Sequence, residues 1–229
     1  MSAITDKIRS KGYWDVTIRP KPYDDNRVGY GELEEILTKA AVRLRGWPVP
    51  FIDHREPVTR GASWIGQDVN AEVVEHFEAW RFFMSGQFNH LRAVSADWRT
   101  GREATRVPEG AASAIEIWEI LYYVTEVYEL AARLALGPAG GEGITVSIQL
   151  NGLEQRALVV GQPNRVPFSS LQLANMPSFE QAIELPRSEL VGDPQWKAVE
   201  TSREFFLRFG WNPSLDQLKE LQRELIERG

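Results

Sequence analysis

The sequence of 229 residues contains no cysteine. Disulfide bonds, thiolate zinc sites and cysteine nucleophiles are therefore excluded together. A chain without cysteine suits a reducing compartment, and we expect a cytoplasmic location. The N-terminal stretch is charged from its start and has no continuous apolar segment, so we also expect no secretory signal peptide.

Long uncharged apolar runs are missing as well. The most apolar segment, 115–136, is long enough to span a membrane, but it contains Glu116, Glu119, Glu126, Glu129 and Arg133. Carboxylates at this density are too costly in hydrocarbon. We therefore expect a long buried helix at 112–136 and no membrane span. Its charges are predicted to form a solvated stripe at helical spacing, with Glu129 and Arg133 as an i, i+4 pair.

Standard motifs for phosphate binding, nucleophilic catalysis and zinc proteases are also absent: there is no G-x-x-x-x-G-K-[ST], no G-x-S-x-G and no H-E-x-x-H. The glycine-rich stretch 137–143 follows a predicted helix and precedes a strand, which is typical of a helix end and connector. Metal ligands are available in number, namely His54, His76 and His90 with Asp53 and Glu75 beside two of them. Their spacing favours ordinary histidines, so we predict neither a metal nor a cofactor.

The net charge of −6 is unevenly distributed along the chain. Residues 1–107 carry 16 Lys/Arg and 15 Asp/Glu, whereas residues 108–229 carry 10 and 17. Non-specific nucleic-acid binding depends on a basic surface, which this balance does not support, although a local basic pocket in the first half is compatible with it. We expect a single domain over 1–229, with a possible division into a β-rich half at 1–107, rich in Arg and Trp, and an acidic helix-hairpin-helix half at 108–229.

Alternation of apolar and polar residues predicts several strands. Strands are expected at 13–18, 62–69 and 179–185, and a further pair between 74 and 95 is expected to meet in a type II′ turn at Gly86-Gln87. The polar stretch 97–110 is interpreted as a loop. The strongest local prediction is a hairpin about Asn151-Gly152, with a type I′ turn that would pair Ile148 with Gln155 and Val146 with Ala157.

Helical periodicity appears in three further places. Apolar residues from Leu33 to Leu44 predict an amphipathic helix that ends near Gly46, because Pro48 and Pro50 cannot continue it. Two helices are expected at the C-terminus, the first holding Trp196, Val199 and Phe206. The second should begin at Ser214 with a capping box to Gln217 and carry an apolar stripe of Leu215, Leu218, Leu221 and Leu225. The predicted fold class is α+β: a mixed or antiparallel sheet packed against the long buried helix, with C-terminal helices.

Tryptophan is abundant, with eight in the chain, and several adjoin arginine, as in Arg45-Gly-Trp47, Trp80-Arg81 and Trp98-Arg99. Arginine stacks on indole and its planar fork matches phosphate or carboxylate, so such clusters occur in sites for anionic ligands. A simpler interpretation is that the tryptophans fill the core while the arginines lie along its rim. The candidate ligand-binding residues are Arg43, Arg45, Trp47, Arg55, Arg81, Trp80, His90 and Arg99.

These residues predict a non-enzymatic binding or sensor module, one component of a larger assembly, that recognises a nucleotide, a nucleic acid or an acidic partner surface. In that case Arg45, Trp47, His54 and Arg81 should line one concavity. A first alternative is a hydrolase or nuclease-like enzyme in which Asp53 and His54 converge with His76 or His90. A second is a structural subunit that assembles through 214–228, which requires an exposed leucine stripe.

Overall fold

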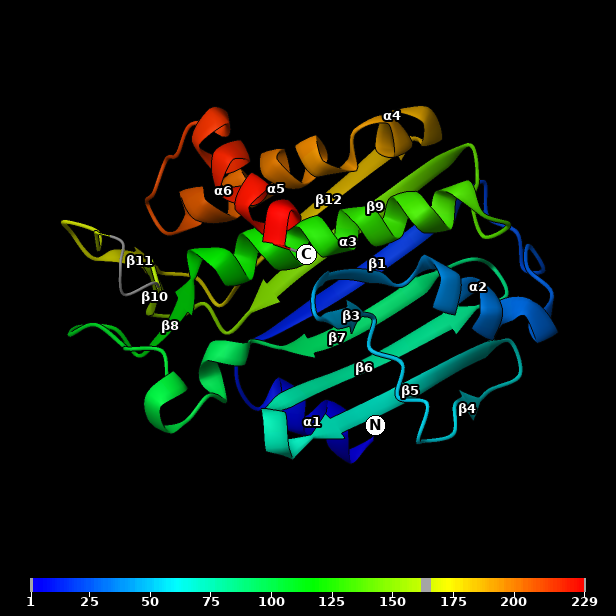
Figure 1. Cartoon of the computed structure of the whole chain (residues 1–229), viewed down its shortest axis with the longest axis horizontal. Helices are drawn as coiled ribbons and strands as arrows, with labels where there is room; N and C mark the ends of the chain where they lie inside the picture. The colour runs from blue at the N-terminus through cyan, green and yellow to red at the C-terminus, as the bar shows by residue number, and fades with distance from the viewer. Residues whose placement is uncertain (1, 162–165, 229) are drawn as a thin grey trace.

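A seven-stranded antiparallel sheet forms the centre of the molecule in this computed structural model, which describes residues 2–161 and 166–228 (Figure 1). The strand order is β12-β9-β1-β7-β6-β5-β4, and every neighbouring pair is antiparallel. These strands are β1 (Tyr13–Lys21), β4 (Thr59–Arg60), β5 (Trp64–Ala71), β6 (His76–Phe83), β7 (Phe88–Ala93), β9 (Gly143–Asn151) and β12 (Ser178–Pro186).

Two smaller sheets and six helices surround this sheet among the described residues. The smaller sheets are β11-β10-β8, in which β8 and β10 are parallel, and the hairpin β2-β3. Their strands are β2 (Val42–Arg45), β3 (Trp47–Val49), β8 (Ser113–Glu116), β10 (Arg156–Val159) and β11 (Gln172–Ala174). The helices are α1 (Ala3–Arg9), α2 (Leu33–Ala40), α3 (Ile117–Leu136), α4 (Arg187–Gly192), α5 (Pro194–Arg208) and α6 (Leu215–Arg228). Short 3₁₀ turns are η1 (Tyr30–Glu32), η2 (Glu72–Val74), η3 (Ser95–Asp97) and η4 (Gly101–Glu103). The predicted α+β class is therefore confirmed.

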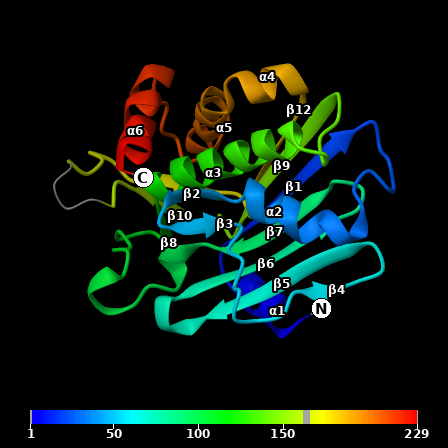
Figure 2. The same cartoon turned by 45° about the vertical axis from the view of Figure 1, so that its right-hand side comes forward.

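The long helix α3 crosses one face of the sheet (Figure 1). Of its 20 residues, 17 are buried, as expected for a helix that is apolar on nearly all sides. The β4–β7 end of the same face is covered by α2 and the β2-β3 hairpin, and the β12–β9 end by α4 and α5 (Figure 2). On the opposite face Ile4 and Ile8 of α1 form a second small core with Phe77, Ala79 and Ala93.

Strand alternation builds the main core as predicted. Trp14, Val16 and Ile18 of β1 are buried together with the alternate residues 144, 146, 148 and 150 of β9. Because side chains of a strand point to the two faces in turn, this alternation turns one apolar face of the sheet toward α3. The expected strands at 62–69 and 179–185 are present as β5 and β12.

The predicted hairpin about Asn151-Gly152 is wrong. Ile148 pairs with Val16 and Gln181, because both edges of β9 are occupied by β1 and β12. Strand β10 instead joins β8 and β11 in the second sheet. The N–H of Gly152 donates to the carbonyl of Pro177 at 3.0 Å, so the Asn-Gly pair turns the chain away from β9.

Two other turns differ from the sequence interpretation. The helix predicted to reach Gly46 ends at Ala40, and 42–45 form β2, because their alternation of apolar and charged residues suits a strand that pairs with β3. Arg43 and Arg45 therefore do not cap a helix. The β6–β7 hairpin is confirmed, but its loop is longer than the expected two residues, because β6 ends at Phe83 and β7 begins at Phe88. The N–H of Phe83 donates to the carbonyl of Gln87, and Gly86 has φ +79°.

The segment around α3 also departs from expectation. Residues 113–116 form β8, and the helix begins only at Ile117. The predicted solvated stripe is wrong for Glu119 and Glu126, which are buried. Glu129 accepts a hydrogen bond from Gln195 at 3.0 Å, and Arg133 donates to the carbonyl of Ala41 at 2.7 Å, so these two residues serve tertiary contacts.

The C-terminal helices lie where the sequence predicts. The N–H of Gln217 donates to Ser214 Oγ at 3.1 Å, as expected for a helix N-cap. Leu218 and Leu225 are fully buried, and Leu215 and Leu221 pack against the main core. The leucine stripe is thus covered by the protein's own core. None of the helices in the described part of the chain is long and apolar enough to cross a membrane.

A buried ion pair attaches the second sheet to the first. Arg156 of β10, 2% exposed, donates from both terminal nitrogens to the carboxylate of Asp97, each at 2.7 Å. It also donates to the carbonyls of Gly152 and Ala114, so the guanidinium is well satisfied. The same Asp97 carboxylate accepts the N–H of Gly12 at 2.8 Å.

Replacing Asp97 with alanine should therefore destabilise the fold strongly. The substitution leaves the Arg156 guanidinium buried without its counter-charge, which typically costs about 3–5 kcal/mol. Urea unfolding at neutral pH measures the loss. Glu34→Ala is the matched control, because it removes an exposed ion pair with Arg60 and should cost below about 1 kcal/mol. Equal losses in the two variants would contradict this account.

Candidate functional site

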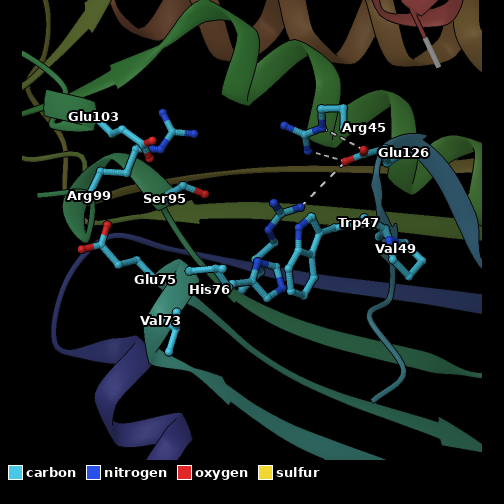
Figure 3. Close-up of a pocket in the computed structure, with 13 residues that line it drawn as sticks. Arg45, Trp47, Val49, Val73, Glu75, His76, Ser95, Arg99, Glu103 and Glu126 are labelled. Atoms are coloured by element: carbon cyan, nitrogen blue, oxygen red, sulfur yellow. Dashed lines mark hydrogen bonds and ion pairs between the residues drawn. The ribbon is translucent and has the colours of Figure 1, made fainter. Parts of the chain in front are cut away.

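A cavity of about 480 Å³ lies between the β2-β3 hairpin, the adjoining ends of β6 and β7, and α3 (Figure 3). Its lining is rich in charged side chains, with apolar groups along one rim. The lining residues are Arg45, Trp47, Pro48, Val49, Val73, Val74, Glu75, His76, Arg92, Ser95, Arg99, Glu103 and Glu126.

The floor of the cavity is polar because two strands place charged groups on the core face. His76 and Glu78 lie two residues apart on β6, and His90 and Arg92 lie two apart on β7. In the β6–β7 register Glu78 faces Arg92 directly. A spacing of two keeps all four side chains on one face of the sheet. The opposite face of these strands packs against α1.

Glu78 is the hub of this floor and has no exposed surface. Its Oε1 accepts the backbone N–H of Phe51 at 2.6 Å, and its Oε2 lies 2.7 Å from His76 Nε2 and 3.5 Å from His90 Nε2. Burial by itself raises the pKa of Glu78, but attraction to His90 and His76 outweighs it, so the pKa lies well below its usual range. The carboxylate is therefore ionised.

The aromatic ring of Tyr123 continues the chain of contacts into α3. Its hydroxyl lies 3.0 Å from His90 Nδ1. Burial raises the pKa of Tyr123 well above its usual range, so the hydroxyl stays protonated. The neutral phenol is the partner that orients His90.

A second buried carboxylate, Glu126 of α3, is shared by two arginines (Figure 3). Arg45 binds it with two nitrogens, Nε at 2.8 Å and Nη2, whereas Arg92 Nη1 lies 3.8 Å from Oε2. Burial alone lowers the pKa of Arg45, but attraction to Glu126 outweighs it and raises that pKa. Arg45 therefore remains a cation despite its burial.

Arg92 is the unsatisfied member of this group. It donates no hydrogen bond to any described residue, and its Nη1 is buried without a partner. The nearest carboxylate oxygen to Nη1, Glu126 Oε2 at 3.8 Å, is beyond hydrogen-bond distance. The guanidinium lies over the ring of Tyr123, 4.8 Å from the centroid, and only 12% of the side chain is exposed. Arginine has five N–H donors, so this side chain retains most of its hydrogen-bonding capacity at the cavity.

Trp47 of β3 covers one side of the cavity. Its ring stacks on His76 at 5.5 Å with an interplanar angle of 27° (Figure 3). It also contacts the ring of Phe51. The residue remains 41% exposed. Stacking places the indole against the imidazole while leaving part of its surface open, which suits a planar ligand.

The outer rim is held by contacts between two turns. Glu75, in the left-handed region with φ +52°, accepts the N–H and hydroxyl of Thr100 at 3.2 and 2.8 Å. Arg99, which directly precedes Thr100, lies 3.3 Å from Glu116. Glu75 and Arg99 both line the cavity, so this contact helps to set its width.

The predicted candidate residues converge only in part. Arg45, Trp47 and Arg99 line the cavity, and Trp80 and His90 are buried in the sheet face beside it. Trp80 Nε1 donates to the carbonyl of Phe51 at 2.9 Å, which is a structural contact.

Three predicted arginines lie elsewhere. Arg43 is exposed and does not line the cavity. Arg81 directly follows Trp80 in β6, so it lies on the opposite face of the sheet. It pairs with Asp68 at 2.6 Å and lies over the ring of Trp64. Arg55 is bound to Asp53 at 2.8 Å with 81% of its side chain exposed. The expected convergence of Arg81 with the cavity is therefore wrong.

The Asp53–His54 pair does not reach the cavity either. His54 is exposed, and the carboxylate of Asp53 is occupied by Arg55, whose hydrogen bonds lower the pKa of Asp53 to about 2. Neither residue lines the cavity with His76. The geometry expected for a hydrolase centred on Asp53 and His54 is absent from the described residues.

Sequence reasoning missed Glu78, Arg92 and Glu126. A detectable signal was the repeated spacing His-x-Glu at 76–78 and His-x-Arg at 90–92 in two strands predicted to be neighbours. Such spacing places four polar groups on one face. No group of three or more His, Asp or Glu side chains in the described residues is arranged to hold a metal ion.

Comparison with known proteins adds no relationship to this geometry. No protein-family model, no curated protein and no solved structure matches the chain.

The ionised state of Glu78 predicts a specific pH dependence of stability. Its pKa is lower in the folded chain than in the unfolded one, so its contribution is complete above the unfolded value of about 4.3 and is lost as the pH falls below it. The stability advantage of the wild type over Glu78→Gln should therefore shrink as the pH falls below about 4.3. Urea unfolding across this range tests it, with Glu180→Gln on the exposed face as control. An advantage that persists or grows in acid would contradict the assignment.

Proposed function

We propose that this protein is a binding module for a small anionic ligand that carries a flat ring, of which a nucleotide is the common example. The observation that carries the proposal is Arg92: a largely buried guanidinium at a cavity wall with no hydrogen bond to any described residue. Buried polar groups in folded proteins are almost always bonded, so an unsatisfied one calls for a partner.

The local charge favours an anion as that partner. Arg45 already engages both oxygens of Glu126, so that carboxylate serves two guanidinium groups at once. The two guanidinium groups at Glu126 therefore outnumber the carboxylate that they share. An arginine fork binds phosphate or carboxylate with two parallel hydrogen bonds, which gives both energy and orientation.

Trp47 supports a ring as the second part of the ligand. Its indole is already held against His76, so little conformational freedom remains to be lost when a ligand ring stacks on its exposed surface. A volume of about 480 Å³ lies within the range of small-molecule sites. Long nucleic acids and flat acidic protein surfaces fit such a cavity less well than a nucleotide does.

Assembly through the C-terminal helix finds less support. Because Leu218 and Leu225 are fully buried, the leucine stripe would have to leave the core before it could bind a partner. Membership of a larger assembly and a cytoplasmic location both stay predictions from the sequence. The cavity supplies a more direct basis for function.

Adenosine monophosphate should therefore raise the melting temperature more than inorganic phosphate does, and adenosine should raise it least. A ligand that binds only the folded state stabilises it by RT ln(1 + [L]/Kd), so tighter binding at equal concentration gives a larger shift. Arg92→Met should abolish the shift caused by phosphate, because the unsatisfied fork is removed. Trp47→Leu should remove the added effect of the adenine ring. Differential scanning fluorimetry measures all of these shifts.

Arg81→Met is the matched control, because Arg81 sits on a neighbouring strand but is bound to Asp68 on the other face. Its response to each ligand should equal that of the wild type. If phosphate and adenosine monophosphate leave the wild type unchanged, or if both arginine variants lose the shift equally, the proposal is wrong.

A further inference from the structure

We propose that the same cavity hydrolyses phosphate esters, with His76 as the general base. This inference rests on the proposed anion site and assigns it a reaction and a substrate class. It depends on the contacts of His76 rather than on those of Arg92. The hydrolase predicted from the sequence used His76 only together with Asp53 and His54, and these two residues lie outside the cavity.

The contact with Glu78 fixes the tautomer of His76. An ionised carboxylate only accepts hydrogen bonds, so Nε2, 2.7 Å from Glu78 Oε2, must carry the hydrogen. In the neutral ring Nδ1 then holds the free lone pair. No described residue forms a hydrogen bond with Nδ1, and the side chain, 13% exposed, lines the cavity. His76 thus offers an acceptor nitrogen beside the proposed anion site.

The carboxylate behind the histidine is itself fixed. Glu78 is fully buried, and Phe51 and His90 hold it together with His76. A buried carboxylate that orients an imidazole and stabilises its protonated form is the arrangement by which hydrolases make histidine an effective base. The stack of Trp47 on the ring restrains the imidazole further.

The base and the cation lie on the same face of the sheet and both line the cavity. Glu78 and Arg92 are direct cross-strand partners, and His76 is two residues from Glu78 on the same face. A phosphoryl group on the Arg92 fork therefore lies beside a histidine that can take a proton. The guanidinium also stabilises the negative charge on the phosphoryl oxygens in the transition state.

The reaction that follows is hydrolysis by water. His76 Nδ1 accepts a proton from a water molecule as the water oxygen forms a bond to phosphorus. The ester P–O bond breaks with its electron pair on the alcohol oxygen, which then takes the proton from His76. The products are an alcohol and a phosphate, and His76 returns to its neutral form.

Release of p-nitrophenolate from p-nitrophenyl phosphate and from bis(p-nitrophenyl) phosphate tests the proposal and distinguishes monoesters from diesters. We expect turnover of at least one by the wild type. His76→Gln should lower kcat by about 10²- to 10⁴-fold, the usual contribution of a general base, while the thermal shift with inorganic phosphate is retained. Glu78→Gln should lower kcat with little change in KM. His54→Gln, an exposed histidine outside the cavity, should match the wild type.

A second measurement needs no substitution. Carbethoxylation of the wild-type protein, mapped by mass spectrometry, should stop turnover as His76 is modified, and inorganic phosphate should slow that modification. Turnover that survives modification of His76, or that is unchanged in His76→Gln, overturns its role. Binding of phosphate without turnover of either ester overturns hydrolysis and leaves the binding module standing. Absence of both binding and turnover overturns the two proposals together.

Discussion

The burial of two carboxylates of α3 against the sheet is the constraint on which the cavity depends. Glu119 accepts the backbone N–H groups of Ser95 and Ala96, which fixes the turn after β7. Glu126, seven residues or about two helical turns further on, binds Arg45 and thereby holds the β2-β3 hairpin against the helix. An unpaired buried carboxylate costs several kcal/mol, so neither segment can leave without loss of stability. The cavity lies between these two attachments, and α3 sets the distance between its walls.

Two groups of buried charged residues, one around Glu78 and one around Glu126, meet in the cavity, and not all of their side chains have hydrogen-bond partners. Glu78 has both oxygens engaged by Phe51 and His76, and Glu126 has both engaged by Arg45. What stays available is therefore a donor, the fork of Arg92, and an acceptor, Nδ1 of His76. A cation next to a base is a combination that can bind an anion and also move a proton. Glu78 and Glu126 leave these two groups available because their oxygens bind Phe51, His76 and Arg45 instead.

Local periodicity in the sequence identified most elements, whereas pairing required the whole fold. Alternation located β1 and β9, and the apolar run located α3, because burial imposes these periods directly. The hairpin predicted about Asn151-Gly152 does not form because β1 and β12 occupy both edges of β9, and no local pattern in the sequence reveals that pairing. For the site, the alternation of side chains along a strand already places Arg81 and Trp80 on opposite faces of the sheet. The pairing of Glu78 with Arg92 required the register of two strands, and the role of Glu126 required α3 to pack over them.

The arginine- and tryptophan-rich segment 43–55 is divided at Phe51. The N–H of Phe51 donates to Glu78, and its carbonyl accepts from Trp80, so both backbone groups are clamped to the floor of the cavity. Residues before the clamp are held over the sheet, which is why Trp47 can stack on His76. Residues after it leave the cavity, and Asp53 and Arg55 satisfy each other at the surface. The buried side chain of Gln67 holds the backbone of Asp53 through a hydrogen bond to each of its N–H and carbonyl groups, so the second half of the segment is fixed to β5 outside the site.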